Sequence, residues 1–244
     1  MLTKNQLKRI LSLRQKKQRL KQALFVVEGP KVVQEFLDSN YELMEIFSIS
    51  EKYAIYKKQY TPIDLNTLQK ISTLVTPNEV MAIFKIPPPK ELDLSSLILA
   101  LDGLNNPGNL GTIIRLCDWF GIKDLVCSKT SVDCYNPKVV QAAMGSHVRV
   151  NIHYIKLELF LEGKSDSIGT FMDAKASIYD AEFPNKGVVV LGNESKGISK
   201  EVASKLKTEI TIPRFGSIKK TESLNVATAA AIILSEYKRR SIER

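Results

Sequence analysis

Residues 97–115 read LILALDGLNNPGNLGTIIR. The run begins with five apolar residues, which is typical of a strand buried on both faces of a parallel sheet. A polar loop from Asp102 to Asn109 follows, and the apolar residues after it predict a helix that reaches Phe120 and stops at Gly121. Strand, polar loop and helix in this order indicate an α/β fold.

The same unit recurs along the rest of the chain. Leu125–Cys127 and Val188–Leu191 are predicted strands, and the second runs into a glycine-rich polar loop, Gly192–Gly197. Glu209–Pro213 is predicted as a last short strand, followed by a long loop and an alanine-rich helix for which Ser223 is the expected N-cap. Because ligands of such sheets bind beyond the carboxyl ends of the strands, these loops are the candidate site.

The first third of the chain predicts a smaller α/β unit. Helices are expected at 4–22, 30–37, 51–58 and 65–71, and strands at 24–27, 43–49 and 80–86. The run Ile86-Pro87-Pro88-Pro89-Lys90 can continue neither a helix nor a central strand. We therefore expect one domain over residues 1–89 and a second over residues 90–244.

The positive charge of the chain is concentrated at its N-terminus. The 244 residues carry a formal net charge of +9, and no acidic residue precedes Glu28. The basic residues before it are Lys4, Lys8, Arg9, Arg14, Lys16, Lys17, Arg19 and Lys21. Such a segment indicates contact with a polyanion, first of all a nucleic acid. A solvated helix face and a targeting segment of the mitochondrial type are the alternatives.

Composition excludes several classes of protein. No stretch approaches 18 consecutive apolar residues, so no membrane partner is expected. The three cysteines, Cys117, Cys127 and Cys134, form no CxxC pair, and only His147 and His153 are histidines, so no metal site is expected. An odd number of cysteines without a disulfide pattern fits a reducing compartment, and we expect a cytoplasmic location.

Three polar loops carry the unusual side chains. Arg115 lies in an apolar helix, where an arginine is snorkelling, paired with a carboxylate, or directed at an anionic ligand. Glu194, in the second loop, can bind a hydroxyl group or a cation, or cap a helix. Asn225, expected in the first turn of the last helix, has no evident structural purpose. Neither the GxGxxG fingerprint nor a P-loop is present in these loops.

In this order the loops resemble motifs 1, 2 and 3 of the SpoU (TrmH-like) family of RNA ribose 2′-O-methyltransferases. The matching pieces are Asn109…Arg115, Leu191-Gly192-Asn193-Glu194…Gly197 and Ile212-Pro213…Glu222-Ser223-Leu224-Asn225-Val226-Ala227. The stretch Ser12-Leu13-Arg14…Phe25-Val26-Val27-Glu28-Gly29 is similar to the substrate-binding domain that precedes the catalytic domain in many members. One departure is an apparent insertion, Ser217–Thr221, between Gly216 and the Ser-Leu-Asn triplet.

The resemblance implies a C-terminal trefoil-knotted α/β methyltransferase domain of the SPOUT class, behind a small ribosomal-protein-like α/β RNA-binding domain. It implies S-adenosylmethionine as cofactor and a homodimer as the working form. The catalytic residues implied are Asn109, Arg115, Glu194, Ser223 and Asn225. Those implied for cofactor binding are Leu191, Gly192, Asn193, Gly197, Ile212, Pro213, Ser223, Leu224 and Ala227. The residues expected to bind RNA are Lys8, Arg9, Arg14, Lys16, Lys17, Arg19 and Lys21.

The expected reaction is methyl transfer to a ribose 2′-hydroxyl of structured RNA. A separate N-terminal domain favours ribosomal RNA as the substrate over tRNA. Because a guanidinium stays protonated in proteins, we expect Arg115 to bind the adjacent phosphate, with a phosphate oxygen or water as proton acceptor. Asn109 is expected to orient Arg115 or the ribose. The rival class is a non-catalytic RNA-binding protein.

Overall fold

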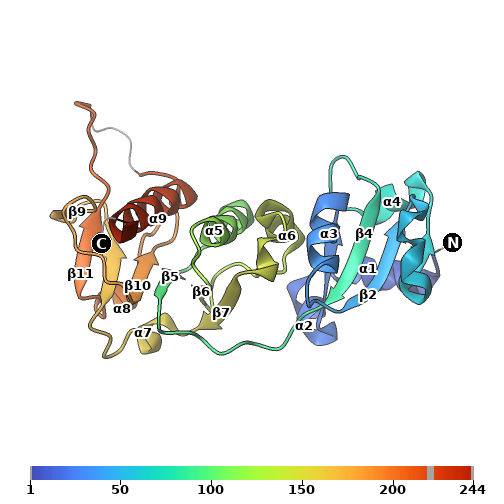
Figure 1. Cartoon of the computed structure of the whole chain (residues 1–244), viewed down its shortest axis with the longest axis horizontal. Coiled ribbons are helices and arrows are strands. Elements are labelled where there is room, and N and C mark those ends of the chain that lie inside the picture. The colour runs from blue at the N-terminus through green and yellow to red at the C-terminus, as the bar shows by residue number, and fades with distance from the viewer. Residues whose placement is uncertain (1, 219–222, 243–244) are drawn as a thin grey trace. The chain divides into compact units, whose positions relative to one another are not determined.

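The structure is a computed structural model that describes residues 2–218 and 223–242. Of the apparent insertion, Lys219, Lys220 and Thr221 lie outside the described residues. The chain divides into two compact units (Figure 1). Unit 1 comprises Met1–Pro89 and Asp133–Val148, and unit 2 comprises Lys90–Val132 and Arg149–Arg244.

Unit 1 is built on a four-stranded mixed sheet with the order β1-β4-β2-β3. Strand β4 is antiparallel to both of its neighbours, and β3 is parallel to β2. The strands are β1 (Leu24–Glu28), β2 (Leu43–Ser48), β3 (Tyr60–Pro62) and β4 (Val80–Lys85). The helices are α1 (Lys4–Ser12), α2 (Lys16–Gln22), α3 (Pro30–Leu37), the 3₁₀ helix η1 (Glu51–Gln59), α4 (Leu65–Ile71), α6 (Pro137–Ala143) and η2 (Ser146–Val148).

Both faces of this sheet are buried. Side chains alternate between the two faces of a strand, so Phe25 and Val27 enter one apolar cluster while Leu24 and Val26 enter the other. The first cluster also holds residues of α3, η1 and α6, and the second holds residues of α1 and α4. Because both faces are covered, two runs of the sheet, residues 24–27 of β1 and residues 80–84 of β4, are apolar without interruption.

The single helix expected over residues 4–22 is wrong, because the chain forms two helices separated by an extended residue, Gln15. The carbonyl groups at the end of α1 explain the break. The Arg19 guanidinium donates to the backbone oxygens of Leu13 (2.9 Å) and Arg14 (3.0 Å). These carbonyls are thereby satisfied without a continuing helix.

Residues 133–148 belong to the core of unit 1 although they follow α5 and β6 of unit 2 in the chain. Asp133 accepts hydrogen bonds from Nε (2.9 Å) and Nη2 (2.5 Å) of Arg19, which is 1% exposed. Val140 lies in the cluster around Phe25, and the Tyr135 ring packs 4.6 Å from the Phe25 ring. The segment therefore supplies both apolar and charged groups to unit 1.

His147, in this segment, is buried and uncharged at neutral pH. Its Nε2 lies 2.8 Å from the Cys134 carbonyl oxygen, while its Nδ1 has no hydrogen-bond partner among the residues that the structure describes. Burial lowers the pKa of His147 from 6.5 to about 4. The folded state therefore prefers the neutral ring over a pH range in which an unfolded chain already takes up a proton.

We expect this histidine to make unit 1 acid-sensitive. Between pH 6.5 and 4 the unfolded state binds the proton and the folded state does not. The free energy of unfolding therefore falls as the pH is lowered, by up to about 1.4 kcal/mol per pH unit. His147→Gln removes the titrating group, and its stability is expected to vary less over this range. Urea unfolding followed by circular dichroism at several pH values measures both slopes. Equal slopes for the two proteins would contradict the prediction.

Unit 2 is built on a seven-stranded sheet in which every pairing is parallel, with the order β7-β6-β5-β10-β8-β11-β9. The strands are β5 (Leu97–Leu101), β6 (Asp124–Ser128), β7 (Asn151–Ile155), β8 (Ser167–Thr170), β9 (Ala176–Ser177), β10 (Gly187–Leu191) and β11 (Thr208–Thr211). The helices are α5 (Pro107–Trp119), α7 (Leu157–Phe160), α8 (Lys200–Ala203) and α9 (Val226–Ile242).

Helices cover both faces of this sheet, with α5 and α9 on one face and α7 and α8 on the other (Figure 1). Leu157 and Val202, from the α7–α8 side, pack on inward residues of β5, β6 and β10. The α/β class expected from residues 97–115 is confirmed. All seven strands run in one direction, so their carboxyl ends, and the loops that follow them, lie along one edge.

Candidate functional site

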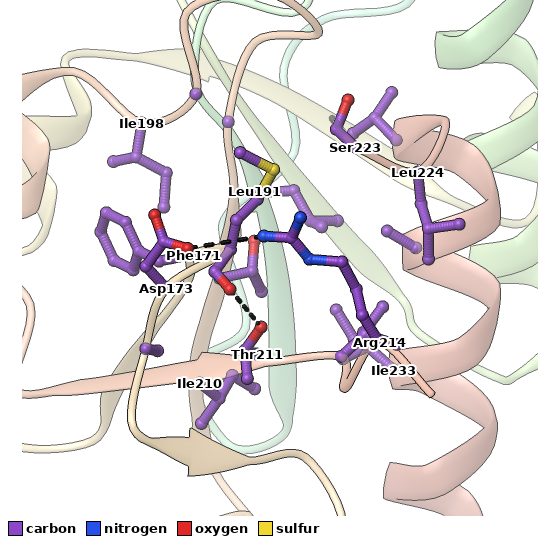
Figure 2. Close-up of a pocket in the computed structure, with 18 of the residues that line it drawn as sticks. Phe171, Asp173, Leu191, Ile198, Ile210, Thr211, Arg214, Ser223, Leu224 and Ile233 are labelled. Atoms are coloured by element: carbon purple, nitrogen blue, oxygen red, sulfur yellow. Dashed lines mark hydrogen bonds and ion pairs between the residues drawn. The ribbon is translucent and has the colours of Figure 1, made fainter. Parts of the chain in front are cut away.

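A pocket of about 950 Å³ lies at the carboxyl ends of β8, β10 and β11 (Figure 2). The loops after these strands and the start of α9 line it. The lining residues include Phe171, Asp173, Leu191, Gly192, Asn193, Glu194, Gly197, Ile198, Ile210, Ile212, Pro213, Arg214, Ser223, Leu224 and Ile233. Apolar side chains make up much of this wall, which suits a ligand with a flat apolar part.

A tight backbone turn forms one wall of the pocket. The amide of Asn193 donates to the Gly197 carbonyl oxygen (2.9 Å), and the amide of Gly197 donates back to that of Asn193 (3.0 Å). The Asn193 side-chain oxygen accepts from the amides of Ser195 and Lys196, each at 3.0 Å. A Cβ on Gly192 would lie 2.2 Å from the Gly197 carbonyl carbon, so only glycine fits at position 192.

Gly192→Ala is expected to distort this turn and to weaken ligand binding in the pocket at least about tenfold, because backbone atoms must move to make room. Gly216→Ala is the matched control, since Gly216 also lines the pocket but its Cβ would meet no atom within 4 Å. Calorimetric titration of both variants with S-adenosylhomocysteine measures the difference. Similar binding by the two variants would contradict the prediction.

Glu194 connects the loops that follow β5 and β10. Its carboxylate accepts hydrogen bonds from the amide of Asn106 (3.0 Å), the amide of Asn105 (3.4 Å) and the side-chain Nδ2 of Asn109 (3.1 Å). The Asn193 side chain donates to the same carboxylate (3.3 Å). Partial burial acts to raise the pKa of Glu194, but its own backbone amide and the donors from the β5 loop outweigh it and lower that pKa. The site therefore contains a carboxylate that stays ionised at neutral pH.

Asn225 extends this network to the third loop. Its Nδ2 donates to Oδ1 of Asn109 (3.0 Å), while its own Oδ1 accepts from the amides of Ala227 (2.9 Å) and Thr228 (3.3 Å). Asn225 is thus the N-cap of α9, and the expectation that Ser223 caps this helix is wrong. One asparagine holds the helix start and the Asn109–Glu194 pair together, which is a structural purpose that the sequence did not reveal.

Arg115 lies outside both the pocket and the network. It occupies the exposed side of α5 together with Thr112 and Trp119, and Trp119 is 83% exposed. Among the residues that the structure describes, none forms a hydrogen bond or ion pair with Arg115. Its guanidinium is therefore available to an anionic ligand or to a second protein chain.

The structure gathers most of the residues implied for cofactor binding. Leu191, Gly192, Asn193, Gly197, Ile212, Pro213, Ser223 and Leu224 all line the pocket. Ala227 is buried in the first turn of α9 and is not part of the lining. Of the residues implied for catalysis, Glu194 and Ser223 line the pocket, and Asn109 and Asn225 are hydrogen-bonded beside it.

The sequence did not indicate the loop after β8. Thr170 to Ala174 line the pocket, and Phe171 and Asp173 are prominent in it (Figure 2). Strand β8 reads Ser167-Ile168-Gly169-Thr170, which is short and carries one apolar side chain of any size. Its central place between β10 and β11 comes from pairing with them, so no apolar run marks it in the sequence.

The basic residues of the first segment serve different purposes. Lys8, Lys16, Lys17 and Lys21 are exposed on α1 and α2. Arg9 is paired with Glu45, and Arg14 donates to the backbone oxygens of Ile71 (3.1 Å) and Ser72 (3.0 Å). Arg19 is buried against Asp133, so the structure gives it a role inside unit 1 and leaves it no surface for RNA.

Three further observations concern metal ligands, membrane-spanning helices and thiols among the described residues. No group of three or more Cys, His, Asp and Glu side chains is placed there to hold a metal ion. No helix in that part of the chain is long and apolar enough to cross a membrane. Burial raises the pKa of the Cys117 and Cys127 thiols well above the usual range, so neither is a nucleophile at neutral pH.

Two family models match this chain, one over its N-terminal part and one over the rest. The sequence model of the SpoU rRNA Methylase family matches residues 96–235, and that of the MRM3-like substrate binding domain matches residues 4–82. The 23S rRNA (guanosine(2553)-2′-O)-methyltransferase RlmP of Bacillus subtilis is 30% identical over 231 residues, which is 91% of each chain.

Solved structures give the same picture. An AdoMet-bound rRNA methyltransferase from Sinorhizobium meliloti has a TM-score of 0.87 at 26% identity and covers 98% of this chain and 96% of its own. A structure concerned with 2′-hydroxyl methylation of C/U34 on tRNA has a TM-score of 0.55 at 25% identity and covers 62% of this chain and all of its own. The match to the rRNA enzyme thus includes the N-terminal part, whereas the match to the tRNA enzyme leaves more than a third of this chain unmatched.

Proposed function

The chain belongs to the SpoU rRNA methylase family, and on that premise we propose that it transfers a methyl group from S-adenosylmethionine to a ribose 2′-hydroxyl of large-subunit ribosomal RNA. The family, the fold class and the enzyme class expected from the three polar loops are confirmed. The choice of ribosomal RNA rests on relatives that match over both units of the chain.

The pocket residues fit the cofactor. Ile198, Ile212 and Leu224 offer apolar surface to an adenosine, and the turn around Gly192 offers close backbone approach. The ionised carboxylate of Glu194 lies in the same wall, where it favours a bound cation. When bound, S-adenosylmethionine supplies an activated sulfonium methyl group.

One observation carries the reaction class: the network of Asn109, Glu194 and Asn225 joins three separate loops beside that pocket. We assign Asn109 to this network as a positioning residue, because both ends of its amide are occupied by Glu194 and Asn225. Ser223, exposed at the pocket rim, is assigned to hold the substrate ribose. Arg115 is assigned to bind the phosphate next to the target ribose and to favour negative charge on the attacking oxygen, with a phosphate oxygen or water as proton acceptor.

Unit 1 is assigned to hold the RNA. Its exposed lysines, Lys8, Lys16, Lys17 and Lys21, lie within 14 residues of one another on α1 and α2, and they are suited to phosphate contacts. Arg9 and Arg14 serve mainly to fix α1 against the rest of the unit. This assignment keeps the RNA-binding role expected for the N-terminal segment and moves it onto the lysines.

Methyl transfer from labelled S-adenosylmethionine tests the proposal. The substrate is total RNA from cells that lack the enzyme, separated by size after the reaction and then digested with alkali. Label in large-subunit RNA, within an alkali-resistant dinucleotide, is the expected result, since a 2′-O-methyl group blocks alkaline cleavage. Label in tRNA would establish the other substrate class. Binding of RNA with no transfer to any fraction would favour a non-catalytic RNA-binding protein.

We further propose a homodimer as the working form, a trefoil knot formed by the segments around the pocket, and action in the cytoplasm. The homodimer is supported by α5, where Arg115 and Trp119 lie on one exposed face outside the pocket. A large exposed tryptophan beside an exposed arginine that has no partner among the described residues is typical of a surface that becomes covered on assembly.

The single tryptophan makes the dimer measurable. If the exposed face of α5 is the interface, the emission maximum of Trp119 is expected to shift to shorter wavelength as protein concentration rises. The mass from light scattering should double over the same range. Thr112→Glu, on the same face, is expected to abolish both changes, whereas Lys200→Glu on α8 leaves them intact. A dimer whose tryptophan emission does not change would place the interface elsewhere.

A further inference from the structure

The side chain of Arg214 extends across the pocket. Arg214 follows β11, and its Nη2 lies 3.5 Å from Oδ1 of Asp173, which follows β8 (Figure 2). The two partners differ in exposure, since the Arg214 side chain is 37% exposed and that of Asp173 is 90% exposed. Arg214 is therefore the partner that belongs to the pocket, and Asp173 is at its solvent-exposed rim.

The contact with Asp173 is readily exchanged. An ion pair with so exposed a carboxylate, at 3.5 Å, holds its partner weakly because water solvates and screens both charges. A ligand carboxylate that occupies the pocket displaces water from the same guanidinium as it binds. Charge-assisted and bidentate contacts of arginine are stronger once water is displaced.

Arg214 is also the best placed cation in the pocket. Among the lining residues that the structure describes, the other cation is Lys196, which lies at the tip of the turn after Gly192. The remaining charged residues named in the wall, Asp173, Glu194 and Glu209, are acidic. A ligand that carries both a cation and a carboxylate thus meets acidic groups for the first and the guanidinium of Arg214 for the second.

We propose that Arg214 binds the carboxylate of the methionine end of S-adenosylmethionine, leaving Asp173 to do so. This inference rests on the proposed function, since it names the group by which the same pocket recognises its cofactor. Arg214 is then a cofactor-binding residue that distinguishes ligands with an amino-acid end from those without one.

Calorimetric titration with three ligands tests the contact. S-Adenosylmethionine and S-adenosylhomocysteine carry the carboxylate, and 5′-methylthioadenosine lacks the whole amino-acid end. Arg214→Gln is expected to raise the Kd of the first two about tenfold or more and to change that of the third less than about twofold. Arg214→Lys should fall between the wild type and Arg214→Gln, because lysine lacks the planar fork. Asp173→Asn, which removes the competing carboxylate, should tighten the first two ligands.

Controls separate the possible failures. Lys175→Ala removes an exposed positive charge near Asp173 and is expected to leave all three Kd values within about twofold. Thermal unfolding of each free variant establishes that it is folded. Equal weakening of all three ligands by Arg214→Gln would overturn the proposal, as would unchanged or tighter binding of S-adenosylmethionine. A wild-type protein that binds none of the ligands would instead overturn the proposed function.

Discussion

Arg115→Ala is expected to lower the rate constant of methyl transfer about 10²- to 10³-fold while the Kd of S-adenosylmethionine changes less than about twofold. The reason is the place of Arg115, which is exposed on α5 and does not line the cofactor pocket. Its removal therefore takes away a positive charge outside the cofactor pocket and leaves the pocket lining unchanged, and light scattering establishes that the variant keeps the oligomeric state of the wild type. Single-turnover transfer to ribosomal RNA, with the cofactor Kd from calorimetry, measures both quantities.

Two further variants make this result specific. Arg115→Lys keeps the charge but loses the planar fork, so it is expected to recover part of the rate. Arg149→Ala removes an equal charge from an exposed pair with Asp118 and is expected to change the rate less than about threefold. If Arg115→Ala instead weakened cofactor binding as strongly as it lowered the rate, the arginine would act through the pocket and the phosphate-binding role would be wrong.

Much of the fold and part of the site could be predicted because the signals are local. The apolar runs of β5 and β10 mark strands buried on both faces, and the polar loops after them mark the edge where ligands bind. Gly192 could be predicted to matter for the same reason, because the glycine-rich sequence around it is itself typical of a tight turn.

The remainder depends on partners that are distant in the sequence. Nothing near Arg19 distinguishes it from Lys17, because its partner Asp133 is 114 residues away. Asn225 looked like a catalytic side chain without a structural purpose, yet it caps α9 and holds Asn109, which is 116 residues away. Strand β8 is defined by its pairing with β10 and β11 and carries no apolar run of its own. Local patterns cannot reveal any of these.

Asp133→Ala is expected to lower the free energy of unfolding of unit 1 by about 3–5 kcal/mol, because it leaves the buried Arg19 guanidinium without its counter-charge. The pair has side-chain exposures of only 2% and 9%, and two nitrogens of Arg19 contact one oxygen of Asp133. The same guanidinium accounts for the end of α1, so an uncompensated charge there should also loosen the junction between α1 and α2. Urea unfolding of the full chain, followed by circular dichroism, measures the loss.

Two further variants distinguish the loss of the counter-charge to Arg19 from a general loss of contacts. Glu42→Gln breaks an exposed ion pair with Lys85 in the same unit and is expected to cost less than about 1 kcal/mol. Arg19→Met combined with Asp133→Leu removes both charges, so the double variant should be more stable than Asp133→Ala although it differs more from the wild type. If the double variant were the less stable of the two, the carbonyl groups of Leu13 and Arg14 that Arg19 satisfies would matter more than its charge. Residues 133–148 would then hold unit 1 together mainly through Tyr135, Val140 and the apolar cluster around Phe25.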